Sequence, residues 1–152
     1  MAGSFRILVV EDEPVIRELV RSLLTETDCE VETASHAADG LKLAKTQTFD
    51  LVLLDVVLPP VGSIQLDGIA VCRMLRADPR TAKTPIYMLT AKAKKSDVET
   101  AMKAGANGYI HKPFRGAELM DLVSQLKARV AAAGSRTTCP LLHSWKSQVR
   151  AM

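Results

Sequence analysis

Residues 50–55 read Asp-Leu-Val-Leu-Leu-Asp, a continuous apolar run of strand length that ends in an acid. Such runs are typical of strands that are buried on both faces of a parallel sheet. We therefore predict a strand over 50–54 that ends at Asp55. Four further segments are predicted strands: 5–10, 29–33, 85–90 and 107–111.

Longer amphipathic segments separate these strands. Pro14 suits the first turn of a helix, and the apolar side chains that follow it recur at helical spacing. One predicted helix begins at Pro14, and four more cover 37–46, 68–77, 96–104 and 115–130. Strands that alternate with helices predict an α/β fold with a mostly parallel sheet covered on both faces. Ligands bind such sheets beyond the carboxyl ends of the strands.

Length and composition favour one soluble globular domain. The chain has 152 residues, 47% of them hydrophobic and 24% charged. No apolar run reaches the roughly 18 to 20 residues that span a bilayer, and the first residues do not resemble a signal peptide. We expect a cytoplasmic protein that does not contact membranes. Its three cysteines lack the spacing of a zinc site, and we expect them to be reduced.

The charge is unevenly distributed. All 17 acidic residues precede position 131, and the excess of basic residues comes from Arg136, Lys146 and Arg150. The balanced body shows no dense basic face, so we expect no direct nucleic-acid partner. We predict a domain over 1–130 and a C-terminal tail over 131–152 that is disordered, an extra packed helix or a docking segment.

Polar residues follow the ends of four predicted strands: Glu11 with Asp12, then Asp55, Thr90 and Lys112. Three carboxylates at one edge of a sheet would repel one another unless a cation neutralised them. Mg²⁺ is the expected cation because it prefers oxygen ligands and needs few carboxylates. A hydroxyl and an ammonium group in the same place suit phosphate oxygens.

Five short motifs lie at these strand ends: 10–13 (Val-Glu-Asp-Glu), 55–59 (Asp-Val-Val-Leu-Pro), 67–68 (Asp-Gly), 89–92 (Leu-Thr-Ala-Lys) and 105–114 (Gly-Ala-Asn-Gly-Tyr-Ile-His-Lys-Pro-Phe). With these motifs in this order, residues 5–130 resemble the receiver domain of response regulators in two-component signalling, of the chemotaxis-regulator kind. The resemblance implies a flavodoxin-like, doubly wound sheet of five parallel strands in the order 2-1-3-4-5, with five helices.

The resemblance also implies roles for the site residues. Asp55 would be the phosphoacceptor, a nucleophile that takes a phosphoryl group from a partner's histidine. Asp12 would bind Mg²⁺ directly, Glu11 would hold it through water, and Asp55 and the backbone carbonyl of Val57 would complete the protein ligands. Lys112 would neutralise charge on the transferring group. The domain would promote its own phosphorylation and dephosphorylation only, and would not be an enzyme for other substrates.

A conformational switch belongs to the same resemblance. Thr90 would hydrogen-bond the new phosphoryl group, Tyr109 would turn inward, and the surface of the fourth helix, fifth strand and fifth helix would change. Lys112-Pro113 would be a cis peptide bond. The implied partners are a histidine kinase or histidine phosphotransfer protein and a downstream protein target. We expect a stand-alone receiver, and the sequence leaves both monomer and homodimer open.

The same residues allow other interpretations. The acids Glu11 and Asp12 also suit the start of a helix. A Mg²⁺-dependent phosphohydrolase with an aspartyl nucleophile is disfavoured because such enzymes have a second acid where Val57 stands, and a phosphorylation-independent binding module would not need the acidic site. The loop over 60–66 is about five residues longer than is usual in receivers. We predict that Ile64 and Leu66 cover the site or contact a partner.

Overall fold

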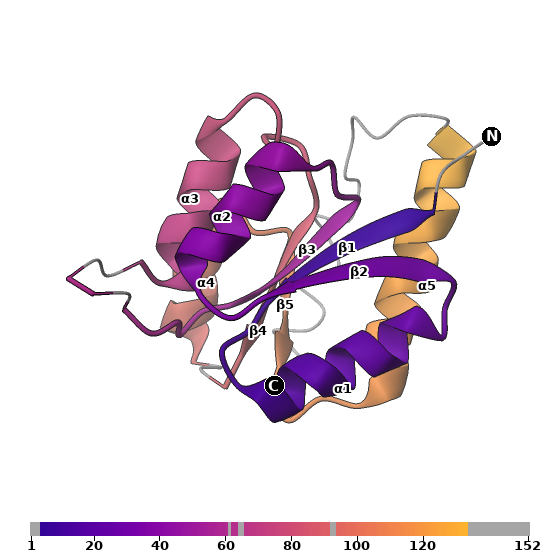
Figure 1. Cartoon of the computed structure of the whole chain (residues 1–152), viewed down its shortest axis with the longest axis horizontal. Coiled ribbons are helices and arrows are strands. Elements are labelled where there is room, and N and C mark those ends of the chain that lie inside the picture. The colour runs from indigo at the N-terminus through magenta and orange to yellow at the C-terminus, as the bar shows by residue number, and fades with distance from the viewer. Residues whose placement is uncertain (1–3, 61, 64–65, 92–93, 134–152) are drawn as a thin grey trace.

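The computed structural model describes residues 4–60, 62–63, 66–91 and 94–133. Within them, strands and helices alternate along the chain (Figure 1). The elements are β1 (Phe5–Val10), α1 (Pro14–Thr25), β2 (Cys29–Ala34), α2 (Ala37–Thr46), β3 (Leu51–Asp55), α3 (Gly68–Ala77), β4 (Ile86–Thr90), α4 (Lys95–Lys103), β5 (Gly108–His111) and α5 (Gly116–Ala133). All strand pairs are parallel and the order is β2-β1-β3-β4-β5, which confirms the predicted flavodoxin-like topology.

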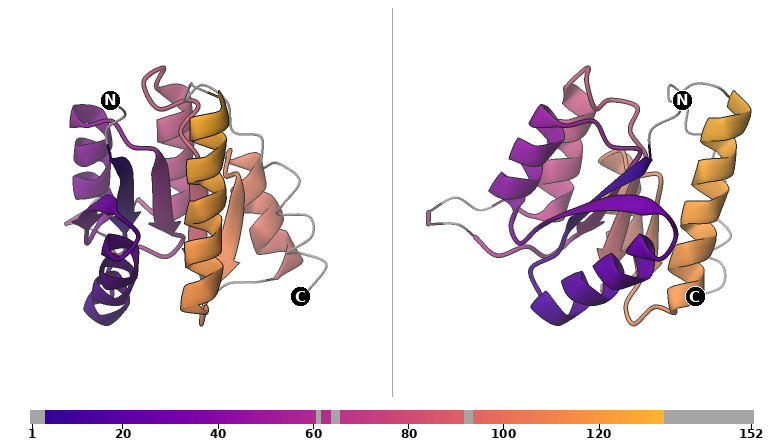
Figure 2. Two further views of the ribbon diagram at one scale, coloured as in Figure 1. Left: turned by 90° about the vertical axis from the view of Figure 1, so that its right-hand side faces the viewer. Right: turned by 45° about the vertical axis from the view of Figure 1, so that its right-hand side comes forward.

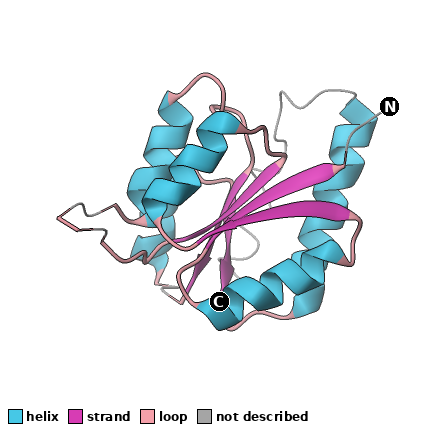
Figure 3. Ribbon diagram, in the orientation of Figure 1, coloured by secondary structure: helices cyan, strands magenta, loops and turns pink. Residues whose placement is uncertain are grey.

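Helices cover both faces of this sheet. Helices α2, α3 and α4 pack on one face, and α1 and α5 pack on the other, as the views in Figure 1 and Figure 2 show. Successive side chains of a strand point to opposite faces. In β1, Leu8 and Val10 therefore join the core under α2 to α4, whereas Ile7 and Val9 join the core under α1 and α5. The result is three layers (Figure 3), with one hydrophobic core on each face of the sheet.

β3 is the central strand, and its sequence explains its place. Its residues Leu51, Val52, Leu53 and Leu54 are buried, because helices cover both sides of the strand and a neighbour pairs with each of its edges. An apolar run without alternation is stable only in such a position. The central position carries Asp55 to the middle of the carboxyl edge of the sheet.

The observed bounds differ slightly from the predicted ones. β3 begins at Leu51 rather than Asp50, whose carboxylate accepts a hydrogen bond from the backbone N–H of Arg6 at 2.9 Å. α5 continues to Ala133 rather than ending at Val130. Residues 134–152, which form most of the predicted tail, lie outside the described residues.

A membrane-spanning helix was not expected. In the part of the chain that the structure describes, no helix combines the length and the apolar character needed to cross a bilayer.

Candidate functional site

Strand register places three strand ends side by side. The last residue of β1 pairs with Leu54, so Glu11 follows at the level of Asp55. Asp55 itself pairs with Leu89, the residue before Thr90. Because all strands are parallel, these ends share one edge of the sheet, which is where the sequence predicted the site.

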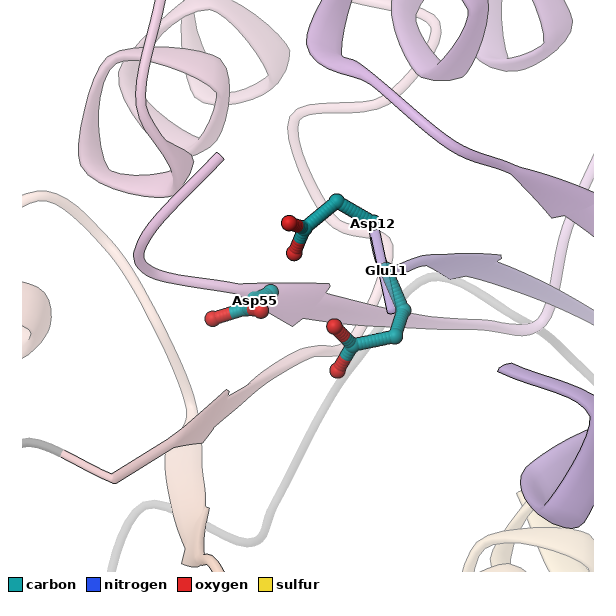
Figure 4. Close-up of side chains that lie close together, drawn as sticks. All are labelled: Glu11, Asp12 and Asp55. Atoms are coloured by element: carbon teal, nitrogen blue, oxygen red, sulfur yellow. The ribbon is translucent and has the colours of Figure 1, made fainter. Parts of the chain in front are cut away.

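Three carboxyl groups converge at this edge. One carboxylate oxygen from each of Glu11, Asp12 and Asp55 lies within 4.8 Å of the others. Glu11 is completely buried, Asp55 is 5% exposed and Asp12 is half-buried. Figure 4 shows their carboxyl groups pointing toward the same space. The structure therefore brings together the three acids that the sequence proposed as one cluster.

Lys112 reaches this cluster from the end of β5. Its Nζ lies 2.5 Å from Oε1 of Glu11 and 3.0 Å from Oδ2 of Asp55, and its side chain is 11% exposed. The backbone N–H of Lys112 donates to the carbonyl oxygen of Thr90 at 2.8 Å, which ties the ends of β4 and β5 together. The Lys112-Pro113 peptide bond is cis, as the resemblance implied.

The burial of these charges shifts their pKa values. Burial raises the pKa of Glu11 to about 7, and the nearby Asp55 carboxylate acts in the same direction. Burial opposes the charge of Lys112, but its hydrogen bonds to Glu11 and Asp55 outweigh that effect and raise the pKa of Lys112. Lys112 thus stays charged, yet its single positive charge does not balance three carboxylates. A cation that prefers oxygen ligands, such as Mg²⁺, fits this donor set.

The residues after Asp55 are held by the start of α3. The Oδ1 atom of Asp55 accepts a hydrogen bond from the Val57 N–H at 3.0 Å, and the Gly68 N–H donates to the Val56 carbonyl at 2.8 Å. A side chain at Gly68 would overlap the carbonyl oxygen of Asp55. Asp67 caps the helix by accepting from the Ala70 N–H at 2.8 Å. The Asp-Gly motif is thus explained by a helix that begins in contact with the end of β3.

Arg17 is a site residue that sequence reasoning missed. Its guanidinium donates from Nη1 to the carbonyl oxygen of Glu11 at 2.9 Å and to that of Asp12 at 3.3 Å. In the sequence, Arg17 looks like any charged residue on the exposed side of an amphipathic helix. Arg17 is distinguished only in the folded protein, where its side chain extends back to the residues that follow β1.

The two proposed switch residues lie in the protein interior. Thr90 is buried at the end of β4. Tyr109 is also buried, and it belongs to the core cluster that contains Val98 and Ala101 of α4. Burial raises the pKa of Tyr109. The inward position of Tyr109 is the one that the resemblance associates with phosphorylation. His111, by contrast, is exposed on β5.

The long loop after β3 is anchored at both ends. Leu58 is buried in the core under α2 to α4, and Leu66 packs against the same core. That Leu66 covers the site or contacts a partner stays a prediction. Ile64 lies outside the described residues.

Comparison with known proteins assigns the family. The family model described as "Response regulator receiver domain" matches residues 7–124. The chain belongs to this family. Two curated relatives of the receiver domain are the transcriptional regulatory protein AfsQ1 of Streptomyces coelicolor and the alkaline phosphatase synthesis transcriptional regulatory protein PhoP of Bacillus subtilis. AfsQ1 is 40% identical over 72% of this chain and 45% of its own length. PhoP is 39% identical over 86% of this chain and 52% of its own length. The chain therefore spans about half the length of the curated relatives that it matches.

Solved structures agree with the fold of this receiver domain. The chemotaxis protein CheY4 of Vibrio cholerae has a TM-score of 0.75 and 27% identity, and the match covers 82% of this chain and 99% of that one. The receiver domain of the sensor histidine kinase PA1611 of Pseudomonas aeruginosa has a TM-score of 0.72 and 34% identity, over 82% and 98% of the two chains. That structure was determined with a magnesium ion coordinated in its active-site cleft.

Proposed function

We propose that this receiver domain accepts a phosphoryl group on Asp55 from a histidine kinase or a histidine phosphotransfer protein. The observation that carries the proposal is the contact of one ammonium group, that of Lys112, with the carboxylates of both Asp55 and Glu11. A carboxylate attacks a phosphoryl group only where the incoming negative charge is neutralised. Asp55 has such a group at hydrogen-bond distance.

The transfer exchanges one bond for another. A carboxylate oxygen of Asp55 forms a bond to phosphorus while the bond from phosphorus to the donor's histidine nitrogen breaks, and the imidazole leaves with the bonding electron pair. Lys112 stabilises the negative charge on the phosphoryl oxygens, and Thr90 donates a hydrogen bond to one of them. Such catalysis depends mainly on positioning and electrostatics.

Mg²⁺ belongs to the same proposal. Asp12 and Asp55 would bind it through carboxylate oxygens, Glu11 through a water molecule, and Val57 through its backbone carbonyl. When bound, Mg²⁺ supplies the positive charge that the three acids and the phosphoryl group require. The raised pKa of Glu11 and the convergence of the carboxylates within 4.8 Å support a cation at this place.

The proposed output is a change of shape that a protein partner recognises. Thr90 and Tyr109 lie on adjacent strands, and Tyr109 packs in the core under α4. A movement of Thr90 toward the phosphoryl group would therefore act on the surface formed by α4, β5 and α5. We propose that this surface controls a downstream protein target and does not bind nucleic acid directly.

The phosphoryl donor needs a docking surface beside Asp55. Val15 is 79% exposed and Leu19 is 49% exposed, and both lie on one side of α1, one turn apart. Val15 follows the acidic pair closely in the chain, and Val57, beside the phosphoacceptor, is also exposed. We propose that these apolar side chains contact the donor protein.

The decisive experiment is incubation with acetyl phosphate and Mg²⁺, followed by intact-mass measurement. Wild-type protein should gain the mass of one HPO₃, and Asp55→Asn should not. Asp121→Asn, a change at an exposed acid of α5, is the matched control and should react as wild type. An equal adduct on Asp55→Asn would show that another residue is the acceptor. Asp12→Asn should raise the Mg²⁺ concentration needed for half-maximal rate, and Asp121→Asn should leave it unchanged.

A further inference from the structure

We propose that Arg17 is a positioning residue for the acidic pair, and that it fixes where the Glu11 and Asp12 carboxylates point. The inference rests on the proposed Mg²⁺ site. Arg17 extends from α1 back to the end of β1, where its Nη1 donates to the carbonyl oxygens of Glu11 and Asp12 at 2.9 and 3.3 Å. Its own backbone N–H donates to the carbonyl of Glu13 at 2.9 Å. One residue thus contacts the backbone of all three residues between the strand and the helix.

The connection that Arg17 holds lacks the usual support. α1 begins after Glu13, whose side chain makes no capping hydrogen bond, and Pro14 at the first helical position has no N–H to donate. Helices generally begin with a Ser, Thr, Asp or Asn side chain that fixes the entering chain. Here the carboxylate of Glu11 accepts a 3.2 Å hydrogen bond from the Glu13 N–H, and the Glu11 N–H donates to the Ala34 carbonyl at 3.0 Å. Arg17 adds its hydrogen bonds to the carbonyls of Glu11 and Asp12.

The two cations near the cluster contact different atoms. Lys112 contacts carboxylate oxygens of Glu11 and Asp55, whereas the contacts of Arg17 are to backbone carbonyl oxygens. Arg17 can therefore orient Glu11 and Asp12 without taking the carboxylate oxygens that would bind a metal. Residues that orient metal ligands in this way typically change metal affinity about 10- to 100-fold when they are replaced.

The charge of Arg17 and its proposed positioning role predict opposite effects of its replacement on Mg²⁺ affinity. Loss of a nearby positive charge would by itself strengthen the attraction of the acids for a cation. Loss of positioning would weaken binding, because the carboxylates would have to be ordered when the metal binds. A merely structural role would change the stability of the protein and leave the Mg²⁺ affinity as it is. The sign of the affinity change therefore tests the proposal.

The experiment measures the dissociation constant of Mg²⁺ by titration calorimetry, without a phosphoryl donor. Arg17→Met keeps the apolar part of the side chain and should weaken Mg²⁺ binding about 10-fold or more. Arg17→Lys keeps the charge but lacks the planar fork, and its affinity should be intermediate. Arg21→Met is the matched control, because Arg21 lies one turn further along α1 and pairs with Glu18. Its affinity should stay within about twofold of wild type.

The possible outcomes of this experiment distinguish the role of Arg17, the Mg²⁺ site and the proposed function. Mg²⁺ binding by Arg17→Met that equals or exceeds that of wild type would overturn the proposal. If urea unfolding shows that Arg17→Met does not fold, Arg17→Lys decides: weaker binding supports the proposal, and wild-type affinity overturns it. A wild-type protein that binds no Mg²⁺ would overturn the metal site itself, together with the role of Arg17. A wild-type protein that binds Mg²⁺ but is not phosphorylated would overturn only the proposed function.

Discussion

The Nζ atom of Lys112 lies 3.0 Å from Oδ2 of Asp55, and the same ammonium group contacts Glu11. Two carboxylates therefore share one buried cation. This arrangement orients the Asp55 carboxylate, and one ammonium group does not balance the three carboxyl groups that converge at the site. The contact underlies the role proposed for Lys112 in phosphoryl transfer and its contribution to stability.

Replacement of Lys112 by methionine should affect both phosphoryl transfer and the stability of the protein. Lys112→Met keeps the apolar stem, but it removes the charge that faces the phosphoryl oxygens, and phosphorylation by acetyl phosphate should slow about 10² to 10³-fold. Metal-free protein should also lose about 3 kcal/mol of unfolding free energy, because two buried carboxylates lose their partner. Rates come from intact-mass time courses and stability from urea unfolding.

The control for Lys112 is Lys103→Met at the exposed end of α4. It should change neither the phosphorylation rate nor the stability appreciably. A phosphorylation rate for Lys112→Met close to that of wild type would rule out a role for the ammonium group in transfer. Mg²⁺ should restore part of the stability of Lys112→Met, since it binds the carboxylates that the substitution leaves unpaired.

Gly68 should tolerate no side chain. In Gly68→Ala the new methyl group would overlap the carbonyl oxygen of Asp55, so the start of α3 or the end of β3 must move. We expect a loss of roughly 2 kcal/mol or more of unfolding free energy and slower phosphorylation of Asp55. Circular dichroism during urea unfolding and the acetyl phosphate reaction measure the two effects.

Gly116→Ala is the matched glycine variant. Its methyl group would come 3.3 Å from Cδ2 of Leu23, a flexible side-chain end, at the start of α5. It should be neutral or stabilising, because alanine is a better helix residue than glycine. If both variants behaved alike, close approach to Asp55 would not be the reason for glycine at position 68.

Substitutions on the exposed apolar side of α1 should slow phosphoryl transfer from a protein donor but not from acetyl phosphate. Val15→Ala combined with Leu19→Ala removes exposed apolar contact area beside the site. Transfer from a phosphorylated histidine phosphotransfer domain that is active on wild type should slow about tenfold, corresponding to about 1.4 kcal/mol. Phosphorylation by acetyl phosphate should not change, because that donor is too small to contact α1.

Met74→Ala provides the comparison, since Met74 is exposed on α3. It should leave both reactions unchanged. Equal slowing with acetyl phosphate and with the protein donor would mean that the α1 variant damages the site itself and not a docking surface.

Because the Cys72 thiol is buried, the free energy of unfolding should fall at high pH. Burial raises the pKa of the Cys72 thiol to about 11 from an ordinary 9.0. The folded protein therefore retains a proton that the unfolded chain releases. The resulting stability is fully present below pH 9 and is lost as the pH rises toward 11, by up to about 3 kcal/mol.

The test compares urea unfolding of wild type and Cys72→Ala between pH 8 and pH 11. Other groups titrate in this range in both proteins, so the difference between them isolates Cys72. The wild-type curve should fall more steeply than that of Cys72→Ala. Parallel curves would mean that the thiol titrates in the folded protein as it does in the unfolded chain.

The sequence by itself determined the order of strands and helices, because apolar periodicity and the residues that begin and end each element are local features. The unbroken apolar run before Asp55 predicted a strand covered on both faces, and β3 is such a strand. The strand order came from the resemblance of five motifs to receiver domains. The acids and the lysine at the strand ends were also predicted together, since parallel strands end at one edge.

Only the tertiary structure decided which atoms meet at that edge. Strand register brings Glu11 level with Asp55, and Lys112 reaches both only when β5 lies beside β4. The role of Arg17 and the overlap that would follow a side chain at Gly68 were equally hidden. Gly68 approaches a strand end that lies 13 residues earlier in the chain, and Arg17 reaches its carbonyls only because the chain turns between β1 and α1. Side-chain periodicity records which face a residue occupies but not which backbone it touches.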